Sequence, residues 1–240
     1  MAEVMSEVTY VKHHKRKIAY LFSAMRHFAN SLGDDGIAVR YRQLDDPDNA
    51  GSLAGEVANA IAAFGPDRIV ITAPGEYRLA DEMAGWQARF GLAVDIRADT
   101  RFLCSLDDFA EWAERRKSLR MEFFYRDLRR RYQVLMEGDE PIGGKWNYDA
   151  DNRQPPKAGL AVPPPSSFAP DAITTEVLAL VEMRCADHFG QLARFDFAVT
   201  RDQALHVLDQ FIGDRLSLFG TYQDAMIEGE PWMYHSHIGL

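Results

Sequence analysis

Cysteine is nearly absent from this 240-residue sequence, since Cys104 and Cys185 are its only two. They lie far apart, and neither belongs to a Cys-x-x-Cys pair. The sequence therefore predicts no disulfide framework and no zinc site, which would need paired cysteines or ligands at short spacings. The seven histidines show no metal-ligand spacing either. We predict no metal ion bound by this chain alone and expect both thiols to be ordinary core or surface groups.

Long apolar runs and excess positive charge are also missing. No stretch approaches the length of about 18 apolar residues that a membrane-spanning helix needs, and residues 1–10 lack the basic-then-apolar order of a signal peptide. We therefore expect a cytoplasmic protein without a membrane segment. The 27 Lys and Arg residues stand against 36 Asp and Glu, and the net charge is −9. This balance excludes general coating of nucleic acid unless basic residues are concentrated locally.

Hydrophobic residues make up 47% of the sequence, enough for a buried core, and their spacing alternates between two periods. Apolar residues at every third or fourth position predict amphipathic helices, and short apolar stretches after glycine or proline predict strands. Alternating helices and strands are typical of a parallel sheet covered on both faces. We predict an α/β fold with a Rossmann-like, doubly wound parallel sheet. The helix–strand pairs are residues 13–32 and 37–44, 52–64 and 69–71, and 79–90 and 93–96.

The composition changes after residue 136. Seven prolines and four glycines lie between residues 137 and 171, which predicts a linker without regular structure. Residues 174–185 and 201–216 then have helical spacing with no strand between them. The predicted domains are an α/β domain at 1–136, a Pro/Gly-rich interdomain linker at 137–172, and the first helices of an all-helical domain at 173–240.

Both ends of the chain look incomplete. Ala2-Glu3-Val4 is typical of the last residues of a strand, and a doubly wound sheet without an inner strand would expose its neighbour's edge. We therefore expect the first strand of the sheet to be missing. The helical segment after residue 173 is short for a domain, so we expect that domain to be incomplete as well.

Five segments resemble, in the same order, the prokaryotic iron–sulfur-containing branch of the cryptochrome/photolyase family. One contains His-His-Lys-Arg-Lys-Ile at positions 13–18, and another contains Gly-Gly-Lys-Trp-Asn-Tyr-Asp at positions 143–149. The five segments are residues 3–18, 23–28, 72–78, 116–126 and 143–153.

The resemblance implies a light-dependent flavoprotein photolyase, similar to (6-4)-type DNA photolyases, that splits pyrimidine photoproducts by electron transfer from reduced FAD. The implied cofactors are FAD, a lumazine-type antenna and a 4Fe-4S cluster, and the implied partner is damaged DNA. By the same resemblance, residues 1–136 are an antenna-type α/β domain, and residues 173–240 are the first helices of the FAD-binding helical domain. A cluster held by cysteines needs four thiolates, and this sequence has two. The part of the helical domain that forms the flavin pocket is also expected to be missing, so this chain alone is expected to retain no cofactor stoichiometrically and to be inactive. A cryptochrome-type blue-light photoreceptor stays open as an alternative, as does a stand-alone Rossmann-like binding module without catalysis.

The resemblance and the strand ends give candidate cofactor-binding residues but no catalytic residue. Ligands of doubly wound folds lie beyond the carboxyl ends of the strands, which selects three places: residues 3–10, 44–46 and 72–76. Glu7 could equally be a solvated glutamate, Leu21 an ordinary core residue, and residues 74–76 a tight turn. The candidates for the antenna are Glu7, Tyr10, Leu21, Pro74, Gly75 and Glu76, and those for the flavin are Tyr222, His235 and Ser236.

Two basic segments have two interpretations each. Residues 115–131 contain eight basic and only two acidic residues, with Phe123, Phe124 and Tyr125 interleaved. They could form a phosphate-contacting face, or a solvated helix face or interdomain clamp. The same alternatives hold for Lys12–Lys17.

Overall fold

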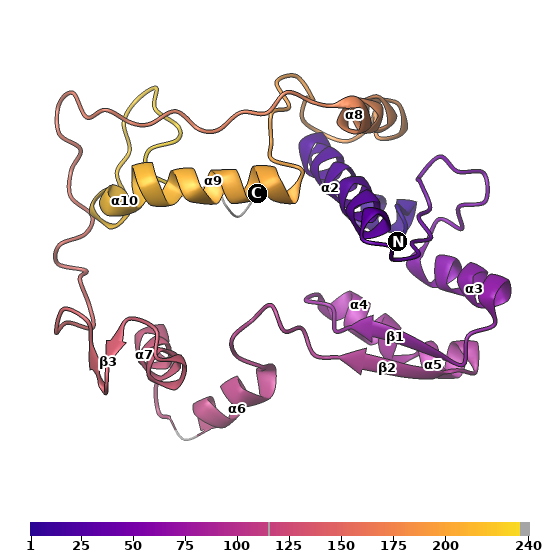
Figure 1. Ribbon diagram of the computed structural model, residues 1–240, viewed down its shortest axis with the longest axis horizontal. Helices are drawn as coiled ribbons and strands as arrows, with labels where there is room; N and C mark the ends of the chain where they lie inside the picture. The colour runs from indigo at the N-terminus through magenta and orange to yellow at the C-terminus, as the bar shows by residue number, and fades with distance from the viewer. Residues whose placement is uncertain (115, 236–240) are drawn as a thin grey trace. The chain divides into compact units, whose positions relative to one another are not determined.

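The computed structural model describes residues 1–114 and 116–235, and it divides into two compact units. Unit 1 consists of residues 1–59 together with the described residues from 149 onward. Unit 2 consists of residues 60–148. Figure 1 shows the helices and strands along the chain. Within the described part, no helix is both long enough and apolar enough to cross a bilayer.

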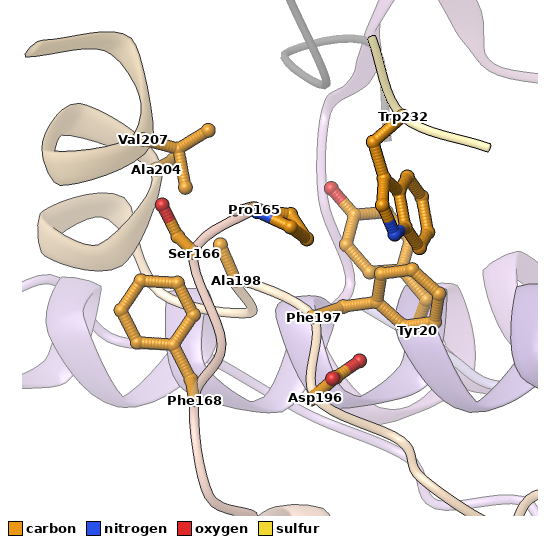
Figure 2. Close-up of a pocket in the computed structure, with 10 residues that line it drawn as sticks. All are labelled: Tyr20, Pro165, Ser166, Phe168, Asp196, Phe197, Ala198, Ala204, Val207 and Trp232. Atoms are coloured by element: carbon orange, nitrogen blue, oxygen red, sulfur yellow. The ribbon is translucent and has the colours of Figure 1, made fainter. Parts of the chain in front are cut away.

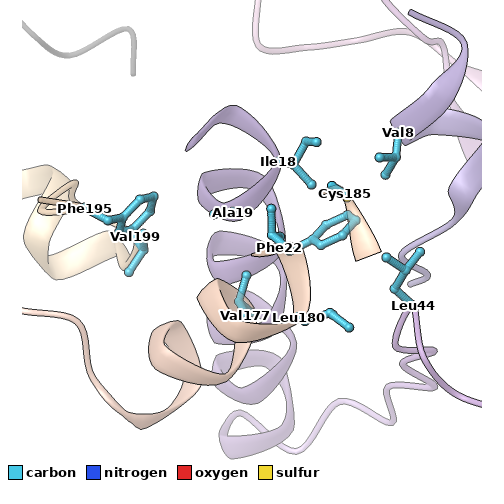
Figure 3. Close-up of a cluster of buried hydrophobic side chains, with 11 residues drawn as sticks. Val8, Ile18, Ala19, Phe22, Leu44, Val177, Leu180, Cys185, Phe195 and Val199 are labelled. Carbon is cyan, nitrogen blue, oxygen red and sulfur yellow. The ribbon is translucent and has the colours of Figure 1, made fainter. Parts of the chain in front are cut away.

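Unit 1 is helical, and its core lies where α2 packs on α8. Ala19 of α2 and Val181 of α8 are fully buried, in the cluster that Figure 3 shows. Asp171 caps α8 by accepting a hydrogen bond from the Thr174 amide. The helices are α1 (Met5–Thr9), α2 (Lys15–Asp34), α3 (Leu53–Phe64, which continues into unit 2), α8 (Ala172–Arg184), α9 (Arg201–Gln210), the π-helical turn η1 (Phe211–Arg215) and α10 (Leu216–Tyr222).

The described residues of unit 2 form a parallel strand pair, the helices α4 to α7 and a short hairpin. In the parallel pair, Arg68 is opposite Ala93 and Thr72 is opposite Arg97. The elements are β1 (Arg68–Thr72), α4 (Tyr77–Ala84), α5 (Trp86–Phe90), β2 (Ala93–Arg97), α6 (Leu106–Glu114), α7 (Met121–Tyr132), β3 (Met136–Glu137) and β4 (Glu140–Pro141).

The described residues form a mixed, mostly helical structure with one small parallel sheet, and they do not form the predicted doubly wound sheet. The expected strand at 37–44 contributes a single parallel bridge, between Ala2 and Arg42. On either side of Arg42, the Tyr41 hydroxyl and the Leu44 amide donate to the buried Glu3 carboxylate, so the Leu44 amide is not available to extend a ladder. The parallel sheet is thus limited to β1 and β2.

The segment predicted as a linker is irregular over most of its length. Residues 142–171 contain neither helix nor strand, as their proline content predicts, although β3 and β4 overlap the start of the segment. The domain boundaries at 136 and 172 stay a prediction. The two compact units differ from the predicted domains, because α2 from the first predicted domain packs on α8 from the last.

Candidate functional site

A buried carboxylate organises the N-terminal part of unit 1. Glu3 is fully buried and accepts four hydrogen bonds on its carboxylate. Arg26 of α2 donates through Nε to Oε1 (2.7 Å) and through Nη2 to Oε2 (3.0 Å). The Tyr41 hydroxyl (2.8 Å) and the Leu44 amide (2.9 Å) donate the other two. The residues that lead into α1 are therefore fixed against α2.

The charged groups around Glu3 are held in defined protonation states. Burial lowers the pKa of Arg26, but the hydrogen bonds and charge of Glu3 outweigh it, and the net shift is upward. Burial, together with the negative charge of Glu3, raises the pKa of Tyr41 far above its ordinary value. Arg26 is thus charged and Tyr41 is a neutral donor at neutral pH. Sequence reasoning missed this network, because a glutamate beside Ala2 and Val4 gives no sign of its burial.

Three antenna candidates lie close to this network along the chain. Glu7 is half-buried on α1 and accepts a hydrogen bond from the Ser6 hydroxyl (3.3 Å). Tyr10 follows α1 and is exposed, with its ring edge-to-face against His13 at 5.1 Å. Leu21 is 46% exposed and lies outside the buried cluster. Leu21 is therefore not a core residue, and its apolar side chain is accessible.

The other antenna candidates belong to unit 2, in the loop between β1 and α4. Pro74 and Glu76 are half-buried, and Glu76 accepts a hydrogen bond from Arg78 Nε at 2.8 Å. Gly75 has an ordinary backbone conformation, and an added Cβ would meet no atom within 4 Å. Neither close backbone approach nor left-handed geometry therefore requires glycine here.

The basic segment Lys12–Lys17 is occupied by contacts within unit 1. Lys12 pairs with Asp187, and Lys15 Nζ lies 3.1 Å from Glu182 Oε1. Arg16 Nε donates to the Gln191 carbonyl oxygen (3.1 Å). These contacts favour the clamp interpretation over a phosphate-contacting face, since the segment holds the chain between α8 and α9 against the start of α2.

Unit 1 also contains an aromatic-lined cavity of about 90 Å³ that the sequence did not reveal. Figure 2 shows the side chains around it. Burial raises the pKa of Tyr20, so its hydroxyl stays protonated and can donate a hydrogen bond. The cavity is much smaller than the 300 Å³ or more, roughly, of a typical cofactor pocket. The lining residues are Tyr20, Pro165, Ser166, Phe168, Asp196, Phe197, Ala198, Ala204, Val207 and Trp232.

The flavin candidates do not form a shared pocket in the described part. Tyr222 is buried and stacks on Tyr234, with ring centroids 5.7 Å apart. The Tyr234 hydroxyl donates to the Ala161 carbonyl oxygen (2.6 Å). His235 is exposed, and Ser236 lies outside the described residues. Tyr222 is therefore a packing residue of a small cluster in this structure.

The cysteines do not supply a site for an iron–sulfur cluster. Cys104 is partly exposed in unit 2, and Cys185 is buried in unit 1. Burial, chiefly, raises the pKa of the Cys185 thiol, which favours the protonated form that does not ligate metals. No group of three or more His, Cys, Asp or Glu residues within 1–114 and 116–235 could hold a metal ion. Two thiols in the whole sequence are also too few for a four-cysteine cluster.

Comparison with known proteins identifies the chain's relatives. Residues 1–197 match the model of the family described as deoxyribodipyrimidine photo-lyase-related protein. The chain is 52% identical over 236 residues to a (6-4) photolyase of Agrobacterium fabrum. This alignment covers 98% of this chain and 46% of that protein. It is 28% identical over 142 residues to an uncharacterized protein of Acanthamoeba polyphaga mimivirus, covering 58% of this chain and 70% of that protein.

The chain thus spans about half the length of the photolyase that it matches. The family match extends from α1 and the Glu3 network through unit 2 and α8, so it includes most elements of both units. The chain belongs to the deoxyribodipyrimidine photo-lyase-related protein family.

Proposed function

We propose that this chain is part of a light-dependent flavoprotein photolyase that splits (6-4) photoproducts in DNA by electron transfer from reduced FAD. The observation that carries the proposal is the 52% identity to a (6-4) photolyase along nearly the whole chain. The aligned stretch is 46% of that photolyase, so the proposed activity is that of a whole protein containing this stretch.

We assign the antenna role to unit 1, with a lumazine-type chromophore as the ligand. The half-buried Glu7 carboxylate can accept hydrogen bonds from ring N–H and ribityl hydroxyl groups. The exposed Leu21 side chain offers an apolar surface for a flat ring. The Glu3–Arg26 network fixes the start of α1 before a ligand arrives, and such preorganisation lowers the cost of binding.

The described residues fit FAD and an iron–sulfur cluster poorly. Tyr222 is engaged with Tyr234, and the aromatic cavity holds far less than a flavin. No step of the reaction is therefore assigned to residues of this chain. Their proposed contribution is the antenna site and the packing of α2 on α8.

A chimaera tests the proposed function. The aligned stretch of the Agrobacterium fabrum (6-4) photolyase is replaced by this chain, and loss of a (6-4) photoproduct from an oligonucleotide is followed under blue light. We expect repair within about tenfold of the parent rate, which corresponds to about 1.4 kcal/mol of activation free energy. The same oligonucleotide with a cyclobutane dimer is the control, and it should stay unrepaired.

A folded chimaera that binds FAD but repairs neither lesion would contradict the proposal. If its flavin is still reduced by light, that result would favour the photoreceptor alternative. Repair of the cyclobutane dimer in place of the (6-4) photoproduct would contradict the proposed lesion type but not the proposed photolyase activity.

A further inference from the structure

Helices α6 and α7, with Arg116 between them and Trp146 after β4, bring together a continuous row of indole, guanidinium and carboxylate groups. Arg130 lies over the Trp146 ring, 4.5 Å from its centroid, and its Nη1 is 3.2 Å from Asp127 Oδ1. Asp127 Oδ2 also accepts from Arg116 Nη2 at 2.7 Å, and Arg116 lies 4.4 Å from the Trp112 ring centroid. We call Trp146, Arg130, Asp127, Arg116 and Trp112 the Arg–Trp row.

The row is more than an ordinary solvated helix face. Arg126 and Arg129 also lie within 5.4 Å and 5.2 Å of the Trp146 ring centroid. Favourable cation–π pairs occur about once per 70–80 residues in proteins, whereas one indole here has three guanidinium neighbours. Several arginines are thereby held in fixed orientations at one place.

The charge of the row is positive, because its carboxylate is shared. Asp127 accepts from two guanidinium groups and from the Trp112 indole N–H (2.9 Å). One negative charge therefore faces two positive ones. Residues 116–132 contain seven basic and two acidic residues in a chain whose net charge is −9. The positive charge is thus concentrated locally, which is the condition for attracting a polyanion.

The guanidinium groups of the row are accessible to a ligand. The side chains of Arg116 and Arg130 are 37% and 44% exposed. A guanidinium stacked on a ring keeps N–H donors at its edges, and these match the geometry of phosphate oxygens. Their ion pairs with Asp127 are exposed and contribute little stability, so phosphate can compete for the same donors.

We propose that the Arg–Trp row contacts the phosphates of DNA, with Trp146 holding the arginines in place. This inference rests on the proposed function, which supplies DNA as the polyanion, and names the surface of unit 2 that meets it. Arg129 has a different role, since it is buried and donates to the carbonyl oxygens of Val134 and Leu135. It secures the end of α7 beneath the row.

Salt-dependent DNA binding tests the proposal. The full chain is titrated into a fluorescein-labelled duplex without a lesion at about 50 to 200 mM salt, where phosphate contacts dominate binding. The double variant R116Q/R130Q should lower the slope of log affinity against log salt by about two, one for each lost phosphate contact. At the lowest salt it should bind at least about tenfold more weakly.

Three control variants separate charge, geometry and folding. R89Q/R97Q removes the same charge from exposed arginines of α5 and β2 and should leave the slope unchanged. R116K/R130K keeps the charge and should keep the slope while binding more weakly, because lysine lacks the planar fork. W146L should weaken binding without changing the slope. Circular dichroism checks that each variant is folded.

Two outcomes would overturn the inference in distinguishable ways. Binding by the wild type with equal slopes in R116Q/R130Q and R89Q/R97Q would overturn this surface and leave the proposed function standing. No binding by the wild type would overturn the inference and also count against DNA as the partner.

Discussion

Glu3 shows how much one buried side chain can contribute to the stability of the fold. Replacing it with Gln leaves the Arg26 guanidinium buried without its counter-charge, and breaking such a pair costs about 3–5 kcal/mol. We therefore expect Glu3→Gln to lower the free energy of unfolding by that order, measured by urea denaturation. Glu176→Gln is the matched control, because Glu176 lies 3.8 Å from the same arginine but is largely exposed. It should change stability by less than about 0.5 kcal/mol.

If Glu3→Gln lowered the free energy of unfolding as little as the control does, water or a rearranged neighbour would be compensating the buried charge of Arg26. The buried network would then not be what fixes the start of α1.

Glu7 is the residue on which the antenna proposal can be tested most directly. If its carboxylate accepts a hydrogen bond from a bound lumazine, Glu7→Ala should weaken binding by about 1–3 kcal/mol in a fluorescence titration. Ser6→Ala removes the neighbouring hydroxyl that donates to Glu7 and should have a smaller effect. Equal affinities of wild type and Glu7→Ala would return Glu7 to the role of a solvated surface group.

At the scale of single elements, α6 begins with a reciprocal cap that depends on pH. The Ser105 hydroxyl and amide donate to Asp108 Oδ2, and the Asp108 amide donates to the Ser105 hydroxyl. These bonds, led by the Ser105 hydroxyl and followed by Arg131, lower the pKa of Asp108 to about 2. A lowered carboxyl pKa stabilises the folded state above the unfolded value, about 3.9 for Asp, and the effect is lost toward pH 2.

We therefore expect Asp108→Asn to be less stable than the wild type at pH 7 and equally stable near pH 2. Chemical denaturation at several pH values measures this difference, which should shrink between about pH 4 and pH 2. A difference that is the same at both ends of this range would show that the carboxylate charge has no part in the cap.

The helices could be predicted from the sequence better than the strands. The α2 helix follows from the spacing of Ile18 and Phe22, both buried, although Leu21 of the same pattern is exposed. Residues 37–44 have the composition of a strand but form one bridge, since a strand needs a partner that local sequence does not specify. The π-helical turn η1 had no sequence signal. Its buried Arg215 donates to the carbonyl oxygens of Pro163 and Pro164 and so anchors the proline-rich segment.

At the scale of the whole molecule, the order of segments along the chain differs from their grouping into compact units. The proline content marks where regular structure stops, but it does not say which helices pack together. That depends on surfaces such as Ala19 on α2 and Val181 on α8, which are more than 150 positions apart. The buried Glu3 carboxylate and the shared Asp127 carboxylate were missed for a similar reason, because their partners are distant in sequence or lie on a neighbouring helix.

The two cysteines fall one in each unit, and this has a practical consequence. Cys104 in unit 2 is partly exposed, whereas Cys185 in unit 1 is fully buried with a raised pKa. A thiol-specific dye should therefore label the native chain at Cys104 alone, and the rate at which Cys185 becomes reactive reports how often unit 1 opens. Cys185 is thus a built-in reporter for the local unfolding of unit 1, and Cys104 is an internal reference that is labelled without unfolding.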